Sequence, residues 1–257
     1  MSGFMQGEIN CFPDSDVLCR SVAEHFLLLS RRFITSQGQF SVALSGGKTP
    51  KRLYQLLAQY CRENERLEGI RFYFGDERHV PMNHGDSNYN MLNNELFIPC
   101  HISQDHVNPI PTECDPSSSA ALYAQTLLAS LPIHDGLPKF DLVLLGMGTD
   151  GHTASLFSLD SIHDDRMVVA THVDKLDAWR ISMNYKLLNN ADNVWVLVTG
   201  ADKTEMFSQL LSGTADALPI ATIEPRGEMI WYVDQDAYPD CIPSASARQK
   251  DSGPLGI

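Results

Sequence analysis

A histidine set among glycines is the residue of this sequence best suited to chemistry. His152 lies in the segment Leu145–Phe157, LGMGTDGHTASLF, two positions after Asp150. The glycines offer no apolar face to pack on, so we expect its imidazole to be more exposed than that of a core histidine, and histidines ordinarily exchange protons near neutral pH. The segment therefore predicts a catalytic loop that carries Asp150 and His152.

The same segment matches the Gly-x-Gly-x-x-Gly pattern of dinucleotide-binding loops. That pattern requires a long helix packed behind the third glycine and a return strand further along the chain. Here the apolar pattern after His152 ends near Leu159 and is followed by Asp160, Asp164 and Asp165. The sequence thus disfavours a nicotinamide enzyme.

Two adjacent glycines indicate a phosphate-binding turn. The turn, Ser45-Gly46-Gly47-Lys48-Thr49, joins an apolar run to a helical pattern. Glycines leave backbone N–H groups free to point at an anion, and a helix N-terminus adds roughly half a positive charge. Lys48 and the hydroxyls of Ser45 and Thr49 can add donors. The competing interpretation is a tight turn that merely needs small residues. The pattern is not that of a Walker A loop.

A third polar segment, Gly75-Asp76-Glu77-Arg78-His79, follows an aromatic-rich apolar run. Arg78 can bind a phosphate through two hydrogen bonds, and Asp76 can take part in proton transfer. The competing interpretation is a solvated surface turn with an internal ion pair.

Two later cations, Arg180 and Lys203, are candidates for binding an anionic substrate. The formal net charge of −13 at pH 7 repels nucleic acid and anionic lipid, so an anion must be captured by a local cluster of cations and amides. Lys203 follows the apolar run VWVLVTG, where a ligand of a parallel sheet would lie. Taken alone, each is a surface charge. We expect no nucleic-acid partner and no membrane association.

Several kinds of site are not indicated. No Gly-x-Ser-x-Gly elbow of an α/β-hydrolase occurs, and no His-Glu-x-x-His spacing suggests a metal. The cysteines form no Cys-x-x-Cys pair, so we interpret all of them as reduced thiols; they are Cys11, Cys19, Cys61, Cys100, Cys114 and Cys241.

Apolar periodicity predicts an α/β fold. Helical spacing covers residues 14–37, 49–64, 86–97, 116–131 and 201–213. Short apolar runs predict strands at residues 40–45, 70–76, 106–110, 140–145, 167–173, 194–200 and 228–234. Their alternation implies right-handed crossovers and a mostly parallel central sheet with helices on both faces. Ligands of such sheets bind at the carboxyl ends of the strands.

The domain organisation follows from length and composition. A chain of 257 residues with 43% hydrophobic and 20% charged residues can fold around one core, and we expect a single domain over residues 1–240. Residues 241–257 are expected to be a flexible tail or a cloning remnant. No signal peptide or membrane span is apparent, which predicts a cytoplasmic protein.

Taken in order, the strings SGGKTP, GDERHVP with SNYNM downstream, LGMGTDGHTASLF and VTGADK resemble the 6-phosphogluconolactonases. The resemblance extends to about residue 235. It implies a modified Rossmann-like α/β fold shared with glucosamine-6-phosphate deaminases. It also implies hydrolysis of 6-phospho-D-glucono-1,5-lactone, a small sugar phosphate lactone, in the oxidative pentose phosphate pathway, without a cofactor.

The resemblance assigns the general base to His152 and places Asp76 and Asp150 where the superfamily has acidic active-site residues. The substrate contacts fall on Ser45, Gly46, Gly47, Lys48, Thr49, Arg78, Arg180 and Lys203. The deaminases carry a glutamate five positions after the histidine, where this chain has Phe157, which favours the lactonase. Ser158 stands where the lactonases usually show proline.

The expected mechanism is general-base catalysis by His152, which contributes about 10²–10⁴-fold. Glycine N–H groups of the loop are expected to stabilise the oxyanion. The alternatives are a deaminase or isomerase of the same fold that acts on an amino sugar phosphate, and a non-catalytic sugar-phosphate sensor. The oligomeric state, monomer or small homo-oligomer, is left open.

Overall fold

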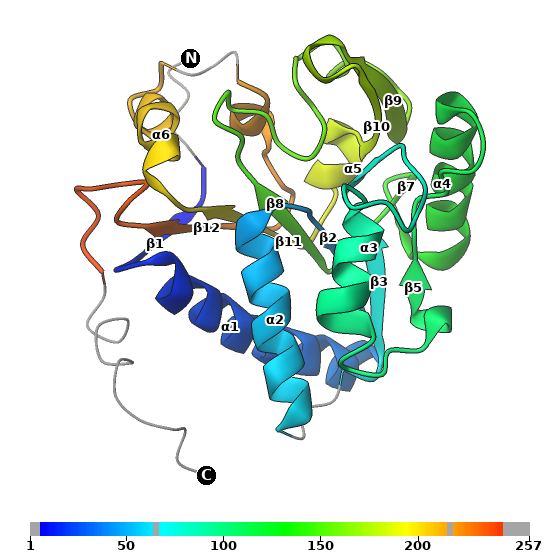
Figure 1. Ribbon diagram of the computed structural model, residues 1–257, viewed down its shortest axis with the longest axis horizontal. Coiled ribbons are helices and arrows are strands. Elements are labelled where there is room, and N and C mark those ends of the chain that lie inside the picture. The colour runs from blue at the N-terminus through cyan, green and yellow to red at the C-terminus, as the bar shows by residue number, and fades with distance from the viewer. Residues whose placement is uncertain (1–5, 64–66, 215–217, 244–257) are drawn as a thin grey trace.

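The computed structural model describes residues 6–63, 67–214 and 218–243, and its centre is a seven-stranded sheet (Figure 1). The strand order is β1-β12-β11-β8-β2-β3-β5, and every neighbouring pair is parallel. The strands are β1 (Glu8–Phe12), β2 (Phe40–Leu44), β3 (Ile70–Phe74), β5 (Val107–Asn108), β8 (Leu142–Gly146), β11 (Asn193–Val198) and β12 (Glu228–Asp234).

The continuous apolar runs form strands because both faces of the sheet are covered. Every residue of β2 and β11 is buried, which explains why these strands lack the alternation of a half-exposed sheet. The predicted α/β class with a parallel sheet is confirmed. Strand β1 was not predicted, since EINCF mixes polar and apolar residues without a run.

The direction of chain progression reverses between β2 and β8. After β2 the chain moves to β3 and β5 at one edge, whereas β8, β11 and β12 progress toward the other edge. The loops that follow β2 and β8 therefore leave in opposite directions and open a crevice at the carboxyl ends of these neighbouring strands. Open α/β sheets bind their ligands at such a switch point.

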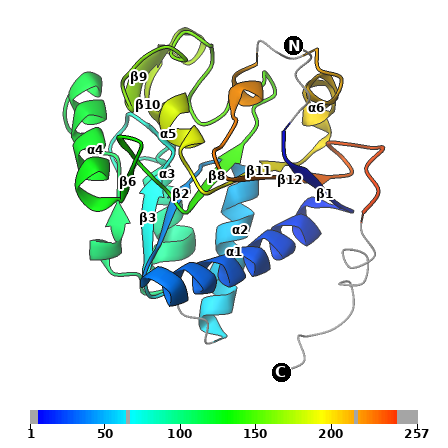
Figure 2. The ribbon, with the colours of Figure 1, turned by 180° about the vertical axis from the view of Figure 1, so that it is seen from behind.

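Helices lie on both sides of the sheet, with α1 and α2 together on one side and α5, α6 and a second sheet on the other (Figures 1 and 2). Asp14 caps α1 by accepting from two backbone N–H groups, and Gly38, at φ 84°, ends it. The helices are α1 (Ser15–Gln37), α2 (Lys48–Arg62), α3 (Asn88–Leu92), the π-helix η1 (Asn93–Phe97), α4 (Pro116–Ser130), α5 (Tyr185–Asn189) and α6 (Thr204–Leu211). Short 3-10 turns are η2 (Gln104–His106), η3 (Asp174–Leu176), η4 (Ala201–Lys203) and η5 (Pro219–Thr222), and β6 (Ile133–His134) pairs with β7 (Leu137–Pro138).

The second sheet is antiparallel and corrects the sequence prediction. Its order is β4-β10-β9, made of β4 (Asp76–Arg78), β10 (Ala178–Met183) and β9 (Val168–Val173). Residues 167–173 were expected in the main sheet, and β10 was not predicted because AWRISM has one charged and one exposed aromatic residue at its start. Pairing places Arg180 opposite Arg78 and Ser182 opposite Asp76.

The prediction of six reduced thiols is wrong. Disulfides join Cys11 to Cys241 and Cys61 to Cys100, with Cα atoms 5.8 and 5.5 Å apart, whereas Cys19 and Cys114 are free. The paired cysteines are 230 and 39 residues apart in sequence, so only the fold brings them within bonding range. Cys241, the first residue of the predicted tail, is buried. Residues 244–257 of that tail lie outside the described residues.

No helix in the described ranges is long and apolar enough to span a membrane. The predicted cytoplasmic location stays a prediction.

Candidate active site

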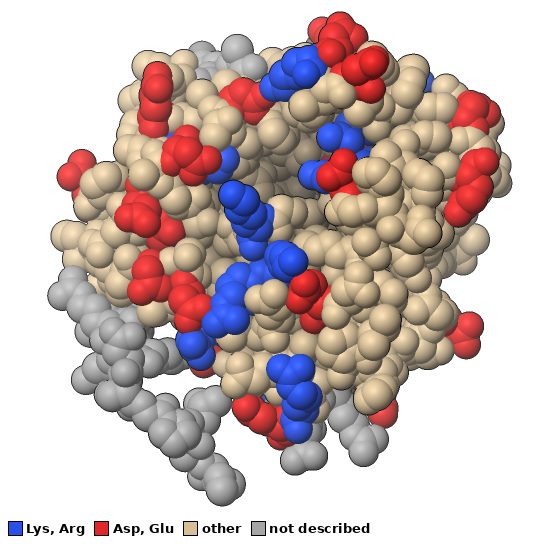
Figure 3. Space-filling view, in the orientation of Figure 1, with Lys and Arg blue, Asp and Glu red and all other residues tan. Residues whose placement is uncertain are grey.

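A cavity of about 600 Å³ opens at the carboxyl ends of β2, β8 and β11. Figure 3 shows a hollow in this face of the molecule with Lys and Arg side chains gathered around it, although the chain as a whole is acidic. The predicted residues that line the cavity are Ser45, Gly46, Gly47, Lys48, Thr49, Asp76, Arg78, His152 and Lys203. Asp150 and Arg180 are not among the lining residues.

The predicted phosphate turn stands at the N-terminus of α2. Gly47 has φ 109°, a conformation that favours glycine, and is the residue before the helix. The buried hydroxyl of Tyr54 donates to the carbonyl of Ser45 at 2.8 Å and accepts from its N–H at 3.2 Å. The Ser45 hydroxyl is itself buried and has no hydrogen-bond partner within the described residues. The turn therefore offers an unused donor to whatever enters the cavity.

Asp76 lies at the back of the cavity and is tied to two other segments. Its side chain is buried and accepts from Ser155 Oγ at 2.6 Å and from Asn88 Nδ2 at 3.3 Å. A Cβ at Gly46 would collide with the Asn88 side chain, so that position requires glycine. The glycine turn, the asparagine and the carboxylate thus form one packed unit.

Glu77 does not line the cavity and supports the chain around Arg78. Its buried carboxylate accepts from the N–H groups of Arg78, Asn88 and Tyr89 and from the Ser87 hydroxyl. Burial raises the pKa of Glu77, although the backbone N–H donors oppose that rise. The alternative interpretation of this segment as a solvated surface turn is therefore wrong.

Arg78 and Arg180 are opposite each other on neighbouring strands of the small sheet. Arg78 lines the cavity, donates to the carbonyl of Asp86 at 2.9 Å and keeps a buried Nε without a partner among the described residues. Partial burial, and next the nearby charge of Arg78, lower the pKa of Arg180. Asp76, Asp86 and Glu77 oppose this lowering, and an anion bound beside the two arginines would stabilise both charges further.

The loop after β8 presents His152 at the cavity. Its Nδ1 pairs with Asp150 Oδ1, and Lys175 Nζ donates to Asp150 Oδ2 at 2.5 Å. Partial burial alone would raise the pKa of Asp150, but the hydrogen bonds from Lys175 and His152 outweigh it, so that pKa is lowered and the carboxylate is ionised at neutral pH. A Cβ at Gly148 would overlap the His152 ring and approach Asp150, so this pair requires glycine there.

Two expectations about this loop need correction. The His152 ring does have an apolar face to pack on, because it stacks on Phe157 with ring centres 4.4 Å apart. The N–H groups of Gly148 and Gly151 donate within the loop, to the carbonyls of His152 and Gly148. They are therefore not available to stabilise an oxyanion.

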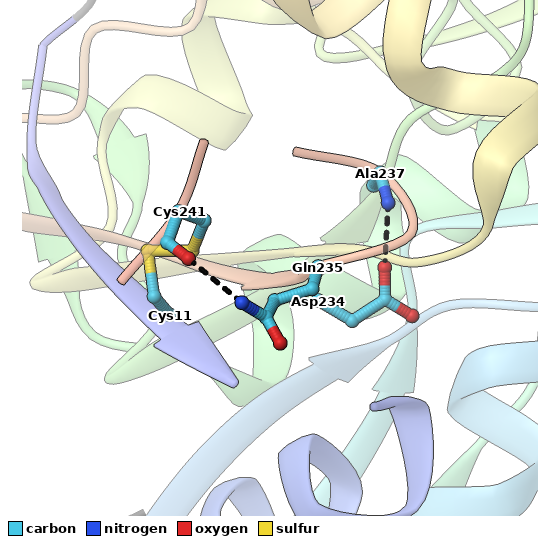
Figure 4. The surroundings of a disulfide bond; sticks show 5 residues. All are labelled: Cys11, Asp234, Gln235, Ala237 and Cys241. Carbon is cyan, nitrogen blue, oxygen red and sulfur yellow. Dashed lines mark hydrogen bonds between the residues drawn. A yellow bond between two sulfur atoms is a disulfide. The ribbon is translucent and has the colours of Figure 1, made fainter. Parts of the chain in front are cut away.

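Lys203 reaches the cavity from the turn after β11. The N–H of Gly200, at φ 92°, donates to both oxygens of Asp234, at 3.0 and 3.2 Å. Figure 4 shows Asp234 also accepting from Ala237 beside the disulfide of Cys241. Burial raises the pKa of Asp234, and the N–H groups of Ala237 and Gly200 oppose that rise. The carboxylate fixes the turn that carries Lys203.

The chain is similar to known proteins over most of its length. Residues 13–231 match the family model of glucosamine-6-phosphate isomerases/6-phosphogluconolactonase. A 6-phosphogluconolactonase from Synechocystis sp. is 38% identical over 210 residues, 79% of this chain and 85% of that protein. One from Treponema pallidum is 36% identical over 216 residues, 82% of this chain and 89% of that protein. The chain belongs to the glucosamine-6-phosphate isomerase/6-phosphogluconolactonase family.

Solved structures extend this likeness. The 6-phosphogluconolactonase from Trypanosoma brucei superposes with a TM-score of 0.84 at 28% identity, covering 92% of this chain and 99% of that one. A monomeric glucosamine-6-phosphate deaminase, at 17% identity and a TM-score of 0.76 over 90% of this chain and 98% of that one, shares the fold. The predictions of a 6-phosphogluconolactonase enzyme and of a fold shared with the deaminases are confirmed.

Sequence reasoning missed several residues at this family's site. Thr199 and Asp202 line the cavity, and the Thr199 hydroxyl lies 2.5 Å from that of Thr49. Lys175 gave no signal, because a lysine in a polar hairpin turn is ordinarily a solvated charge. Within the described ranges, no three His, Cys, Asp or Glu side chains are grouped to hold a metal ion.

Proposed function

We propose that this chain hydrolyses 6-phospho-D-glucono-1,5-lactone to 6-phospho-D-gluconate in the oxidative pentose phosphate pathway, with His152 activating the attacking water. One observation carries the proposal. The imidazole borders the cavity while its Nδ1 pairs with the ionised carboxylate of Asp150. When Nδ1 carries the proton and donates a hydrogen bond to Asp150, Nε2 keeps a lone pair that can take a proton from water. This is the arrangement of a general base.

The phosphate of the substrate is assigned to the cations and amides on the other side of the cavity. Lys48, Arg78 and Lys203 line the cavity, and Arg180 is paired with Arg78 on the neighbouring strand. The N-terminus of the 15-residue helix α2 faces the same space and adds the positive end of its dipole. The unpartnered Ser45 hydroxyl supplies a further donor. An anion bound here leaves the lactone ring to extend toward His152.

The reaction follows from this placement. His152 Nε2 takes a proton as the water oxygen bonds to the lactone carbonyl carbon, and a tetrahedral oxyanion forms. The bond from that carbon to the ring oxygen then breaks, and the imidazolium returns the proton to the departing oxygen. Asp150 stabilises the imidazolium between the two steps, because the carboxylate is ionised. The product acid then ionises to 6-phospho-D-gluconate.

The test is hydrolysis of freshly prepared lactone, corrected for its spontaneous rate. The variant His152→Ala is expected to lose about 10²–10⁴-fold in kcat, the usual contribution of a general base. His134→Ala is the control, since His134 also pairs with an aspartate, Asp135, but does not line the cavity. If His152→Ala kept the full catalysed rate, the proposal would be wrong.

Two further measurements separate the alternatives. A deaminase would release ammonia from glucosamine 6-phosphate, and a sugar-phosphate sensor would bind the lactone without turnover. Phe157 argues against the deaminase, because the position of that family's glutamate is here an aromatic ring stacked on His152. No ammonia release is therefore expected.

A further inference from the structure

Lys175 contacts both side chains that pack against His152, those of Asp150 and Phe157. It lies in η3, the turn between β9 and β10, 25 positions after Asp150. Its Nζ donates to Asp150 Oδ2 at 2.5 Å and lies 5.4 Å from the centre of the Phe157 ring. Asp150 and Phe157 in turn hold His152, one through Nδ1 and the other by stacking. The four side chains therefore form a closed ring of contacts.

We propose that Lys175 is a positioning residue for the lactonase reaction: it fixes Asp150, and through Asp150 the orientation of the His152 imidazole. This inference rests on the proposed role of His152 as the base. Lys175 itself does not line the cavity, so it acts through its neighbours and not on the substrate.

Its structural setting favours this role over that of an incidental surface ion pair. The side chain of Asp150 is 41% exposed, and an exposed carboxylate with one partner can rotate about its χ angles. Lys175 donates to the second carboxylate oxygen, so both oxygens of Asp150 are hydrogen-bonded. Rotation of the carboxylate would break the hydrogen bond to His152 or the one to Lys175. Misplacing a catalytic group by about 1 Å can cost about 100-fold in rate.

The turn that carries Lys175 is itself held in place. His172 lies between two aspartates, 3.0 Å from Asp174 and 3.4 Å from Asp177. Asp177 adopts a left-handed backbone at φ 44°, and its N–H donates to the carbonyl of Asp174. Strand β10, which starts at the next residue, pairs with β4. The position of Lys175 is thus set by the same small sheet that aligns Arg180 with Arg78.

Lys175 also brings a positive charge near the base. Removing that charge removes its repulsion of the imidazolium, so the apparent pKa of the base in the rate profile should rise. The other charged side chains around the cavity stay in place in this variant; they are Lys48, Asp76, Arg78, Asp202 and Lys203. A pH profile therefore reports on Lys175 in a way that a loss of folding would not.

The experiment compares Lys175→Met with wild type in the lactone assay. We expect kcat to fall about 10-fold, with KM changed less than about twofold, because positioning of the base is lost while the phosphate contacts remain. The acid limb of kcat/KM should move to higher pH by about half a unit. Lys175→Arg should restore most of the rate, since arginine can reach the same carboxylate.

Lys186→Met is the matched control. Lys186 is another partly exposed lysine paired with an aspartate, Asp165, and it does not line the cavity. Wild-type kcat and pH profile in Lys175→Met would overturn the positioning role, provided that His152→Ala is inactive. If His152→Ala is also fully active, the base assignment fails instead. A fall in kcat that Lys175→Arg does not restore, or a fall equal to that of Lys186→Met, also contradicts the proposal.

Discussion

The two glycine-bearing segments that follow the neighbouring strands β2 and β8 are held in place by different forces. The turn from Ser45 to Thr49 is fixed by neutral hydrogen bonds, from buried Tyr54 and between Thr49 and Thr199. The loop around His152 is held by charges in addition to its own backbone hydrogen bonds, with Asp150 paired to Lys175 and to His152 itself at partly exposed positions.

This difference matches the role proposed for each segment, phosphate binding for the first and base catalysis for the second. A phosphate stays anionic throughout the working pH range, whether singly or doubly ionised, so its site gains from a preformed array of donors that costs nothing to order. A base must gain and lose a proton in each cycle, and a neighbouring carboxylate stabilises the charged state. We therefore expect changes in the first segment to act on binding and changes in the second to act on turnover.

Among the changes that test this difference, Gly148→Ala is expected to have the largest effect. The added Cβ would overlap the His152 ring and approach Asp150, so the pair must separate or rotate. We expect kcat to fall about 100-fold with a much smaller change in KM, since a misplaced base costs rate and not affinity. Steady-state kinetics on the lactone measure both. Gly85→Ala is the control, because a Cβ there meets nothing within 4 Å. Equal behaviour of the two variants would contradict the packing argument.

How far the sequence reveals these segments depends on how local their signals are. The glycine turn was predictable because FSVALS, SGGKT and the following helical pattern are contiguous, and each forms the element its own residues favour. His152 was predictable for the same reason, as it directly follows the apolar run of β8. Local patterning and the parallel sheet place both at one crevice.

The rest of the site depends on contacts between distant residues. Arg78 and Arg180 are 102 positions apart in sequence and become neighbours only because β4 pairs with β10. Neither strand has a strong apolar pattern that would have predicted this pairing. Lys175 meets Asp150 only through the turn that joins β9 to β10. The cysteine pairs follow the same rule, since Cys11 and Cys241 are joined across 230 residues. Register between separate segments is a property of the whole fold.

A smaller effect, on binding, is expected from Tyr54→Phe. Loss of the hydroxyl leaves the buried N–H and carbonyl of Ser45 without that partner, which costs about 1–3 kcal/mol for each unsatisfied group. We expect a lower free energy of unfolding in urea and a KM for the lactone raised about 5-fold to 10-fold, equivalent to about 1 kcal/mol of binding. The value of kcat should change less than KM.

Tyr123→Phe separates binding from stability in this test. The Tyr123 hydroxyl bridges the N–H and carbonyl of Phe74 at 2.8 and 2.9 Å, the same arrangement at the end of β3. It should lose similar stability while keeping its KM, because Phe74 does not line the cavity. A raised KM in both variants would mean that the tyrosine acts through general loosening of the fold.

The smallest effect concerns the charges that hold the second segment. The pKa of Asp150 is lowered from 3.8 in the folded chain, so its ionised form contributes stability above that pH, and the contribution is lost as the pH falls through the lower folded value. The free energy of unfolding of wild type should therefore exceed that of Asp150→Asn near pH 5, and the gap should close as the pH falls below about 4. Because Asp150 is 41% exposed, a gap of at most about 1 kcal/mol is expected.

The control is Asp86→Asn, at a side chain that is 74% exposed, which should show almost no gap. Urea unfolding at several pH values measures the gap, and a gap that persists unchanged at pH 2 would mean that packing of the loop, and not charge, holds Asp150 in place.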